Sequence, residues 1–265
     1  MILDEIVSHK GGEIADRKLR APIAELMRQA ESQPAPVDIA EALGGEGVAL
    51  IAEIKRASPS KGALAPNLQA ETLAKIYAEN GASAISVLTD ERFFSGTLAD
   101  LSAAKRAVAS SGRSLPILRK DFLLDRYQVV EARAAGADAV LLIVRILSDD
   151  DLHELYAEVS RWKMTALVEV HDETEIERAL SLNPTVVGIN TRDLSDFSID
   201  LDVFGRLRTR LPDSVIAVAE SGIDSAADVA RVGKMGADAV LVGGALVQAP
   251  DTAKKVRELV SGGMK

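Results

Sequence analysis

The sequence predicts a (β/α)8 TIM barrel with an N-terminal helical extension. Short apolar runs, typical of parallel strands buried on both faces, alternate along the chain with longer helical patterns. The strand–helix unit occurs eight times at roughly 27 residues each, the size expected for such a barrel. The signature Gly-Ala-x-Ala recurs at 81–85, 136–140 and 236–240, each time after a helix and before a strand. We therefore expect residues 1–265 to form one barrel domain, with residues 1–47 as its extension.

The extension is expected to be helical up to the first strand. Ile2, Ile6 and Ile14 begin a helical stripe, which predicts packing of this segment on the main domain. Pro34 and Pro36 then break the chain before a short D-I-A-E-A-L helix, and several glycines lead into the first strand.

The predicted strands and helices follow one another in a regular order. Strands are expected near 48–54, 84–88, 115–119, 138–144, 165–170, 185–189, 215–219 and 238–242. Helices are expected near 68–80, 97–110, 125–135, 148–162, 172–182, 200–211 and 224–235, with a last one near 251–261. A doubly wound open sheet is the alternative, but its dinucleotide-binding glycine fingerprint is missing after the first strand.

Composition and charge limit the classes of function. The chain has no cysteine, which excludes a disulfide framework or a thiolate metal site and fits a reducing compartment. Its formal net charge of −9 argues against nucleic-acid or anionic-membrane partners. We see neither a signal-peptide pattern nor an apolar run of membrane-spanning length. We therefore expect a cytoplasmic protein, monomeric, whose partner is a small molecule.

Charged residues stand at the predicted carboxyl end of the first strand. Because side chains alternate along a strand, Glu53 and Lys55 share one face, where burial of two charges is costly. A solvated pair at a strand end is the plain explanation. A catalytic role gains support because other strands end in charged groups too, and these ends meet at the active site of a barrel.

A lysine and a glutamate on two further strands strengthen that interpretation. Lys120 ends its strand at the position alternate to Leu118, so it should face the barrel interior, and Glu169 lies within an otherwise apolar strand. A lysine near Lys55 should lose basicity, whereas Glu53 and Glu169 should restore it. Such a cluster can hold a proton donor and a proton acceptor in one cavity.

Glycine-rich turns follow the seventh and eighth predicted strands. Ser221-Gly222 and Gly243-Gly244 occupy the places where these barrels commonly bind phosphate. Backbone N–H groups can approach an anion closely there because glycine has no Cβ. A phosphorylated substrate is the expected ligand.

Metal chemistry is not expected. His9 and His153 fall on predicted helices, and only His171 lies near a strand end. Without a set of acidic and histidine ligands at suitable spacing, we expect neither a metal nor another cofactor.

Six segments together resemble one enzyme family. I-A-E-I-K-R-A-S-P-S-K-G, L-R-K-D-F, A-L-V-E-V-H, G-I-N-T-R-D-L, A-E-S-G-I and A-D-A-V-L-V-G strongly resemble indole-3-glycerol phosphate synthase, in order, from about residue 48 to 247. The resemblance implies a carbon–carbon lyase of tryptophan biosynthesis. Its substrate would be 1-(2-carboxyphenylamino)-1-deoxyribulose 5-phosphate, closed to an indole ring with loss of carbon dioxide and water.

The resemblance also implies roles for individual residues. Lys120 corresponds to the general acid, and Lys55 to the residue that holds the substrate carboxylate and donates a proton in dehydration. Glu53 and Glu169 resemble the acidic partners, and Asn190 and Arg192 match orienting positions. The positions matching substrate and phosphate binding are Ser58, Ser221, Gly222, Gly243 and Gly244, and those resembling the apolar wall are Phe93, Phe122 and Leu194.

Two departures from the family pattern and two other functions remain open. Gly244-Ala245 stands where the family commonly has a serine or glutamate, and Thr191 replaces a frequent asparagine. Another phosphate-binding barrel enzyme, such as phosphoribosylanthranilate isomerase, fits the two lysines and two glutamates less well. A barrel that binds a phosphorylated ligand without turnover would have no need of Lys120 or Glu169.

Overall fold

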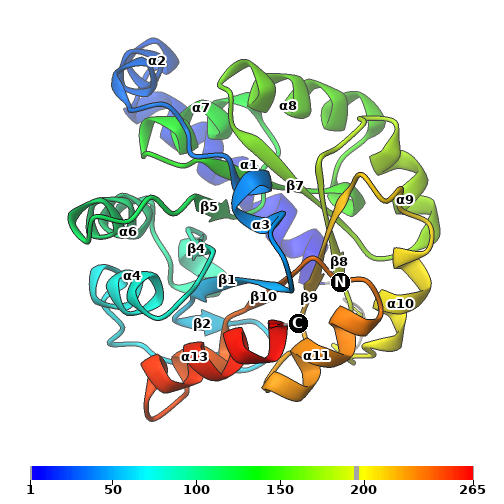
Figure 1. Ribbon diagram of the computed structural model, residues 1–265. Helices are drawn as coiled ribbons and strands as arrows, with labels where there is room; N and C mark the ends of the chain where they lie inside the picture. The colour runs from blue at the N-terminus through cyan, green and yellow to red at the C-terminus, as the bar shows by residue number, and fades with distance from the viewer. Residues whose placement is uncertain (1, 194–196, 265) are drawn as a thin grey trace.

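The computed structural model describes residues 2–193 and 197–264 and contains a closed barrel of parallel strands (Figure 1). The barrel strands are β1 (Ala49–Ile54), β4 (Ala84–Leu88), β5 (Ile117–Lys120), β6 (Ala139–Ile143), β7 (Thr165–Val170), β8 (Val186–Asn190), β9 (Ile216–Glu220) and β10 (Ala239–Val242). Their order is β1-β10-β9-β8-β7-β6-β5-β4, and β4 pairs with β1 to close the ring. The predicted (β/α)8 barrel is confirmed.

The main helices surround the strands. They are α4 (Ala70–Glu79), α6 (Leu98–Ser110), α7 (Arg126–Ala134), α8 (Asp149–Arg161), α9 (Glu173–Leu180), α10 (Asp202–Arg208), α11 (Ala226–Lys234) and α13 (Thr252–Gly263). Side-chain caps start many of them: Thr97, Asp125 and Ser225 each form a capping box with the residue three positions later. These caps satisfy N–H groups that a helix start leaves without partners.

Short elements that the sequence analysis did not assign as separate units follow several barrel strands. They are the hairpin of β2 (Ala57–Ser58) and β3 (Gly62–Ala63) after β1, α5 (Glu91–Phe94) after β4, η1 (Val144–Ile146) after β6 and α12 (Gly244–Val247) after β10. All of them lie at the carboxyl ends of strands. The irregular structure of the protein is therefore concentrated where the active site of such a barrel is built.

A separate apolar core fills the barrel interior. Alternate strand residues such as Ile51, Leu118 and Leu167 point inward and are fully buried. Ile39 and Leu43 of α3 (Ile39–Leu43) join this core and close the amino-terminal end of the barrel. A larger, alanine- and valine-rich core packs the outer faces of the strands against the helices.

The aspartates of the repeated Gly-Ala-Asp segments tie neighbouring strands together. Asp138 accepts hydrogen bonds from the backbone N–H of Ile117 and from Lys105. Asp238 accepts one from the backbone N–H of Ala217. Each aspartate thus fixes the start of an adjacent strand, which gives the repeated signature a structural role in setting register.

The N-terminal extension consists of α1 (Ile2–Arg20), α2 (Ile23–Ser32) and α3. In Figure 1, α3 lies in front of the barrel strands and α1 behind them, so the extension reaches both ends of the barrel. Lys10 of α1 is 1% exposed and binds Asp90 and Asp121 at 2.7 and 3.0 Å. Among the described helices, none has the length and apolar character needed to cross a membrane.

Candidate active site

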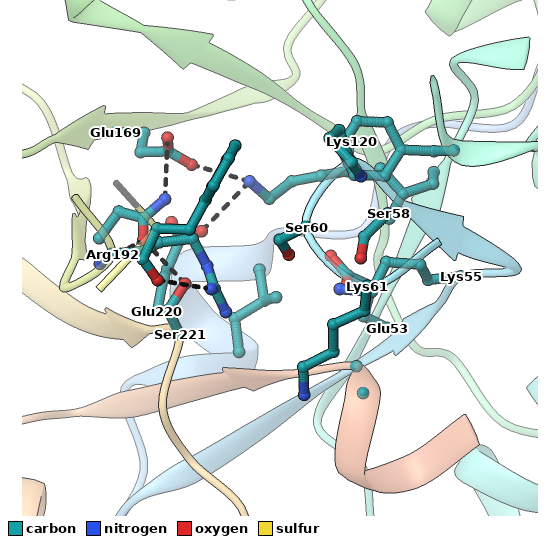
Figure 2. Close-up of a pocket in the computed structure, with 18 of the residues that line it drawn as sticks. Glu53, Lys55, Ser58, Ser60, Lys61, Lys120, Glu169, Arg192, Glu220 and Ser221 are labelled. Carbon is teal, nitrogen blue, oxygen red and sulfur yellow. Dashed lines mark hydrogen bonds and ion pairs between the residues drawn. The ribbon is translucent and has the colours of Figure 1, made fainter. Parts of the chain in front are cut away.

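A pocket opens at the carboxyl end of the barrel, and every barrel strand contributes to its lining (Figure 2). Its polar side comes mainly from the ends of β1, β5, β7, β8 and β9. Its apolar side includes Leu88, Phe94 and Phe122, with Ile2 and Ile6 of α1 at the edge. The rings of Phe94 and Phe122 lie 6.1 Å apart in a tilted arrangement. The pocket can therefore accommodate a molecule with an apolar ring at one side and charged groups at the other.

Lys120 is held between two carboxylates inside this pocket. Its Nζ lies 2.8 Å from Glu169 Oε2 and 3.2 Å from Glu220 Oε2, and dashed lines mark both contacts in Figure 2. Burial alone would lower the pKa of Lys120, but the surrounding carboxylates of Glu169, Glu220 and Glu53 raise it above its ordinary value. Lys120 is thus a charged ammonium with its protons directed into the pocket.

The pKa values of Glu169 and Glu220 are shifted in opposite directions, although both carboxyl groups contact Lys120. Burial raises the pKa of Glu169, but Lys120 outweighs it and lowers the value to about 2. Burial raises the pKa of Glu220 to about 8; Lys120 opposes the rise, whereas the neighbouring Glu169 adds to it. Two carboxyl groups whose pKa values differ in this way supply one proton acceptor and one proton donor at the same position.

Glu53 and Lys55 form a second ion pair across the pocket. Lys55 Nζ lies 2.6 Å from Glu53 Oε2, and the Glu53 side chain is 4% exposed. Gly243 leaves the space for this pair, because a Cβ there would lie 2.2 Å from Glu53 Oε2. Glu53 is further fixed through its backbone, whose carbonyl accepts a hydrogen bond from Tyr77 Oη.

The turn after β9 is backbone-strained and lies in the pocket wall. Ser221 and Gly222 have φ values of 68° and 74°, so two successive residues adopt the left-handed region. Ser221 Oγ donates to Asn190 Oδ1 at 2.8 Å, which holds the turn in place. A Cβ on Gly222 would lie 2.5 Å from Ile199 Cγ2, so a larger residue would have to displace that side chain. Successive N–H groups in such a turn form a concave site for an anion.

Asn190 connects this turn to Glu169, and the backbone N–H of Arg192 donates to Asn190 Oδ1 at 3.1 Å. Asn190 Nδ2 donates to Glu169 Oε1 at 3.3 Å while its oxygen accepts from Ser221. Arg192 lines the pocket and donates to the backbone carbonyl of Phe197 at 3.2 Å. Burial lowers the pKa of Arg192, but the ordinary pKa of a guanidinium is so high that the group stays protonated. Arg192 therefore presents a cation to the pocket.

Comparison with known proteins identifies the family. A sequence model of the family described as indole-3-glycerol phosphate synthase matches residues 3–259. A relative named indole-3-glycerol phosphate synthase from Roseiflexus sp. (strain RS-1) is 50% identical, with 98% of each chain covered. One of the same name from Dehalococcoides mccartyi (strain ATCC BAA-2266 / KCTC 15142 / 195) is 48% identical over 98% of this chain and 100% of its own.

The chain belongs to the indole-3-glycerol phosphate synthase family. The resemblance noted in the sequence is therefore confirmed, and the reaction class is that of a carboxy-lyase. More distant solved structures share only the fold. A 3-hexulose-6-phosphate synthase has a TM-score of 0.62 at 19% identity, covering 81% of this chain and 99% of its own. A thiamine phosphate pyrophosphorylase from Pyrococcus furiosus has a TM-score of 0.61 at 16% identity, covering 85% and 97%.

The pocket brings together most of the residues expected for an indole-3-glycerol phosphate synthase. Those that line it are Glu53, Lys55, Ser58, Lys120, Phe122, Glu169, Asn190, Arg192, Ser221, Gly222, Gly243 and Gly244. Leu194 lies outside the described residues. Phe93 is placed differently from the expectation: its ring packs edge-on against His9 at 5.9 Å, and the pocket is lined by Phe94. Adjacent residues of the short helix α5 point to different sides, and the sequence pattern F-F does not tell which one turns inward.

Glu220 is a site residue that the sequence analysis did not select. It is 2% exposed and lies 3.2 Å from Lys120. The signal was present, because Glu220 ends an apolar strand at the position alternate to the inward-facing Val218. Ser60 and Lys61 of the loop after β1 also line the pocket.

Proposed function

We propose that the chain closes the indole ring of 1-(2-carboxyphenylamino)-1-deoxyribulose 5-phosphate, with Lys120 as the general acid. Family membership supports the overall reaction. The observation that supports the role of Lys120 is its contact with Glu169 at 2.8 Å, which keeps it charged in a buried pocket, with Glu220 at 3.2 Å on its other side. An ammonium held in this way can give a proton to a ketone oxygen that becomes an alcohol.

Ring closure is the first chemical step. The aryl carbon that bears the carboxylate attacks the ketone carbon, and the carbonyl electron pair takes a proton from Lys120 Nζ to form a hydroxyl. Glu220 Oε2 lies 3.2 Å from Lys120 Nζ, and burial favours the protonated form of its carboxyl group. Glu220 can therefore return a proton to the neutral amine of Lys120. The positive charge that develops on the ring nitrogen system is stabilised by the ionised Glu169 and Glu53.

Loss of carbon dioxide and water completes the indole. The bond from the ring carbon to the carboxylate breaks, and its electron pair neutralises the cationic ring. Glu169, the acceptor of low pKa, then removes a proton from the methylene beside the nitrogen. The hydroxyl leaves as water with a proton from Lys55. Glu53 at 2.6 Å keeps Lys55 oriented toward the pocket.

Anchors at the two ends of the substrate would hold its flexible chain in the conformation that brings the two reacting carbons together. The turns Ser221-Gly222 and Gly243-Gly244, with Ser58 nearby, would bind the phosphate, and Arg192 and Asn190 would orient the chain between. Phe94 and Phe122 would hold the aryl ring, a role we also expect for Leu194. Holding the reacting carbons in contact can supply part of the barrier, because the conformational freedom of the chain is removed on binding.

The direct test is turnover by Lys120→Ala, followed through indole fluorescence. We expect a loss of about 100-fold or more, as for removal of a general acid. Lys75→Ala is the matched control, because Lys75 is a half-exposed lysine on α4 that pairs only weakly with Glu71. Near-normal turnover by Lys120→Ala with an intact fold would refute the assignment. Light scattering would test the further proposal that the enzyme acts as a monomer.

A further inference from the structure

A buried histidine lies directly behind Glu169, and the steps described above do not use it. His171 follows the last residue of β7, and its side chain is 4% exposed. Its Nδ1 lies 3.0 Å from Glu175 Oε2 on α9, and its Nε2 lies 3.4 Å from Glu169 Oε1. Within the part of the chain that the structure describes, this Nε2 is a buried polar atom without a hydrogen-bond partner.

The surroundings of Glu175 determine which ring nitrogen carries the hydrogen. Glu175 accepts from Arg145 Nε at 2.5 Å and from the backbone N–H of His171 at 2.8 Å. Its oxygens therefore act as acceptors, and Nδ1 is assigned as the donor from this partner. In the neutral ring, Nε2 then presents its lone pair to Glu169. A lone pair and a carboxylate oxygen cannot hydrogen-bond, which explains why Nε2 is unpartnered.

The contact between Nε2 and Glu169 Oε1 becomes a hydrogen bond when Glu169 takes up a proton. A protonated Glu169 can donate to Nε2, and the imidazole would then lie between two carboxylates as a cation. Two neighbours of Glu169 are donors: Lys120 occupies Oε2 at 2.8 Å, and Asn190 donates to Oε1 at 3.3 Å. A third, Glu220, exchanges its proton with Lys120 in the steps proposed above. Nε2 of His171 is thus an acceptor, outside the cluster around Lys120, that can receive that proton.

We propose that His171 takes up the proton that Glu169 removes from the substrate, so that Glu169 is a carboxylate again before the product leaves. This step rests on the function proposed above. The Oε1–H bond breaks with its electron pair remaining on the oxygen, and an Nε2–H bond forms from the nitrogen lone pair. After product release, water entering the pocket receives the proton by way of Glu169.

The benefit lies in the charge of Lys120. Glu169 is the carboxylate closest to Lys120, at 2.8 Å, and contributes most among the carboxylates to its raised pKa. A Glu169 that kept its proton would leave Lys120, once Glu220 has reprotonated it, without its nearest negative charge. Moving the proton to His171 restores the ion pair for the next turnover. Arg145 supports the arrangement from η1, because it holds both Glu175 and Asp172 beside the ring.

The test uses His171→Gln, whose amide can donate a hydrogen bond but cannot take a proton. We expect kcat to fall about 10-fold or more with KM unchanged, less than the roughly 100-fold or more for a direct general acid or base, because His171 acts through Glu169. His153→Gln is the matched control, because His153 is exposed on α8, where its ring contacts the Asp149 carbonyl, and this change should leave kcat unaltered. Added imidazole should restore part of the kcat lost by His171→Ala.

Each other outcome overturns the proposal. A kcat near the wild-type value in His171→Gln excludes proton uptake by this ring. A lower kcat together with a raised KM, and no recovery of His171→Ala with imidazole, assigns His171 to packing alone. Lys120→Ala assayed in parallel distinguishes a failure of the role of His171 from a failure of the proposed function. If it is inactive while His171→Gln is normal, only the role of His171 fails, whereas an active Lys120→Ala removes the proposed function itself.

Discussion

Gly188 of β8 keeps open the space that the Glu220 carboxyl group occupies, and replacing it with alanine tests the arrangement around Lys120. A Cβ at this position would lie 2.0 Å from Glu220 Oε1 and 3.2 Å from its Cδ. Ordinary van der Waals contact begins near 3.4 Å. The carboxyl group of Glu220 must therefore move by about 1 Å or more, away from a lysine that it now contacts at 3.2 Å.

The displacement should affect catalysis more than folding. A shift of about 1 Å in a catalytic group commonly costs about 100-fold in rate, and we expect a fall of that order in kcat for Gly188→Ala. The barrel interior is close-packed, so some loss of stability will accompany it, about 1–3 kcal/mol for an added methyl group. KM should change little, because the glycine turns that would hold the phosphate lie on β9 and β10 rather than on β8.

The assay is indole formation at saturating substrate, with thermal unfolding as the check on folding. Gly12→Ala is the matched control, since Gly12 is on helix α1 and a Cβ there meets nothing within 4 Å. That control should keep full activity and gain about 0.5–1 kcal/mol of stability. If folded Gly188→Ala turns over at the wild-type rate, Glu220 does not need its observed position, and its proposed role in returning a proton to Lys120 is wrong.

Three further predictions address other parts of the structure. Gly244→Ala adds a methyl group that meets no protein atom within 4 Å, so it should fold normally but raise KM by crowding the phosphate; an unchanged KM would argue against that turn as the anchor. Lys10→Met leaves the buried Asp90 without its cation and should lower the free energy of unfolding by about 3–5 kcal/mol, measured by urea titration. A loss below about 1 kcal/mol would mean that this pair behaves like an exposed one. Because burial raises the pKa of Glu220 from 4.5 to about 8, the folded state binds a proton that the unfolded chain has released between these values. Stability should therefore fall as pH rises through that window, and Glu220→Gln should flatten the fall in thermal midpoints; equal slopes would contradict the assigned shift.

Strand periodicity made most of the barrel and its charged interior predictable. The alternation of side chains along a strand places Glu53, Lys120 and Glu169 on inward faces, and in the structure they line the pocket. The same alternation places Glu220 on the inward face of its strand, so the sequence carries the signal for this residue too. Local rules succeed here because a parallel barrel brings all carboxyl ends of its strands to one rim.

Contacts between distant segments could not be read from such rules. The apolar residues of α1 that reach the pocket edge, and Lys10 beside Asp90 and Asp121, join parts of the chain about 80 or more positions apart. The inward position of Phe94 rather than Phe93 depends on how the four-residue helix α5, which follows β4, packs against β2 and Phe122. These features are set by packing, which periodicity does not encode.

The opposite pKa shifts of Glu169 and Glu220 follow from charge balance in a buried space. One lysine can compensate one carboxylate, so a second carboxylate at 3.2 Å is favoured as the neutral acid once burial is included. The contact of Lys55 with Glu53 at 2.6 Å compensates the second lysine separately. The rim therefore carries two ammonium groups and a spare carboxyl proton within a chain of formal net charge −9. Each ammonium group is balanced by one carboxylate, so an anionic substrate that enters the pocket meets hydrogen-bond donors and an available proton, which ring closure with general-acid assistance requires.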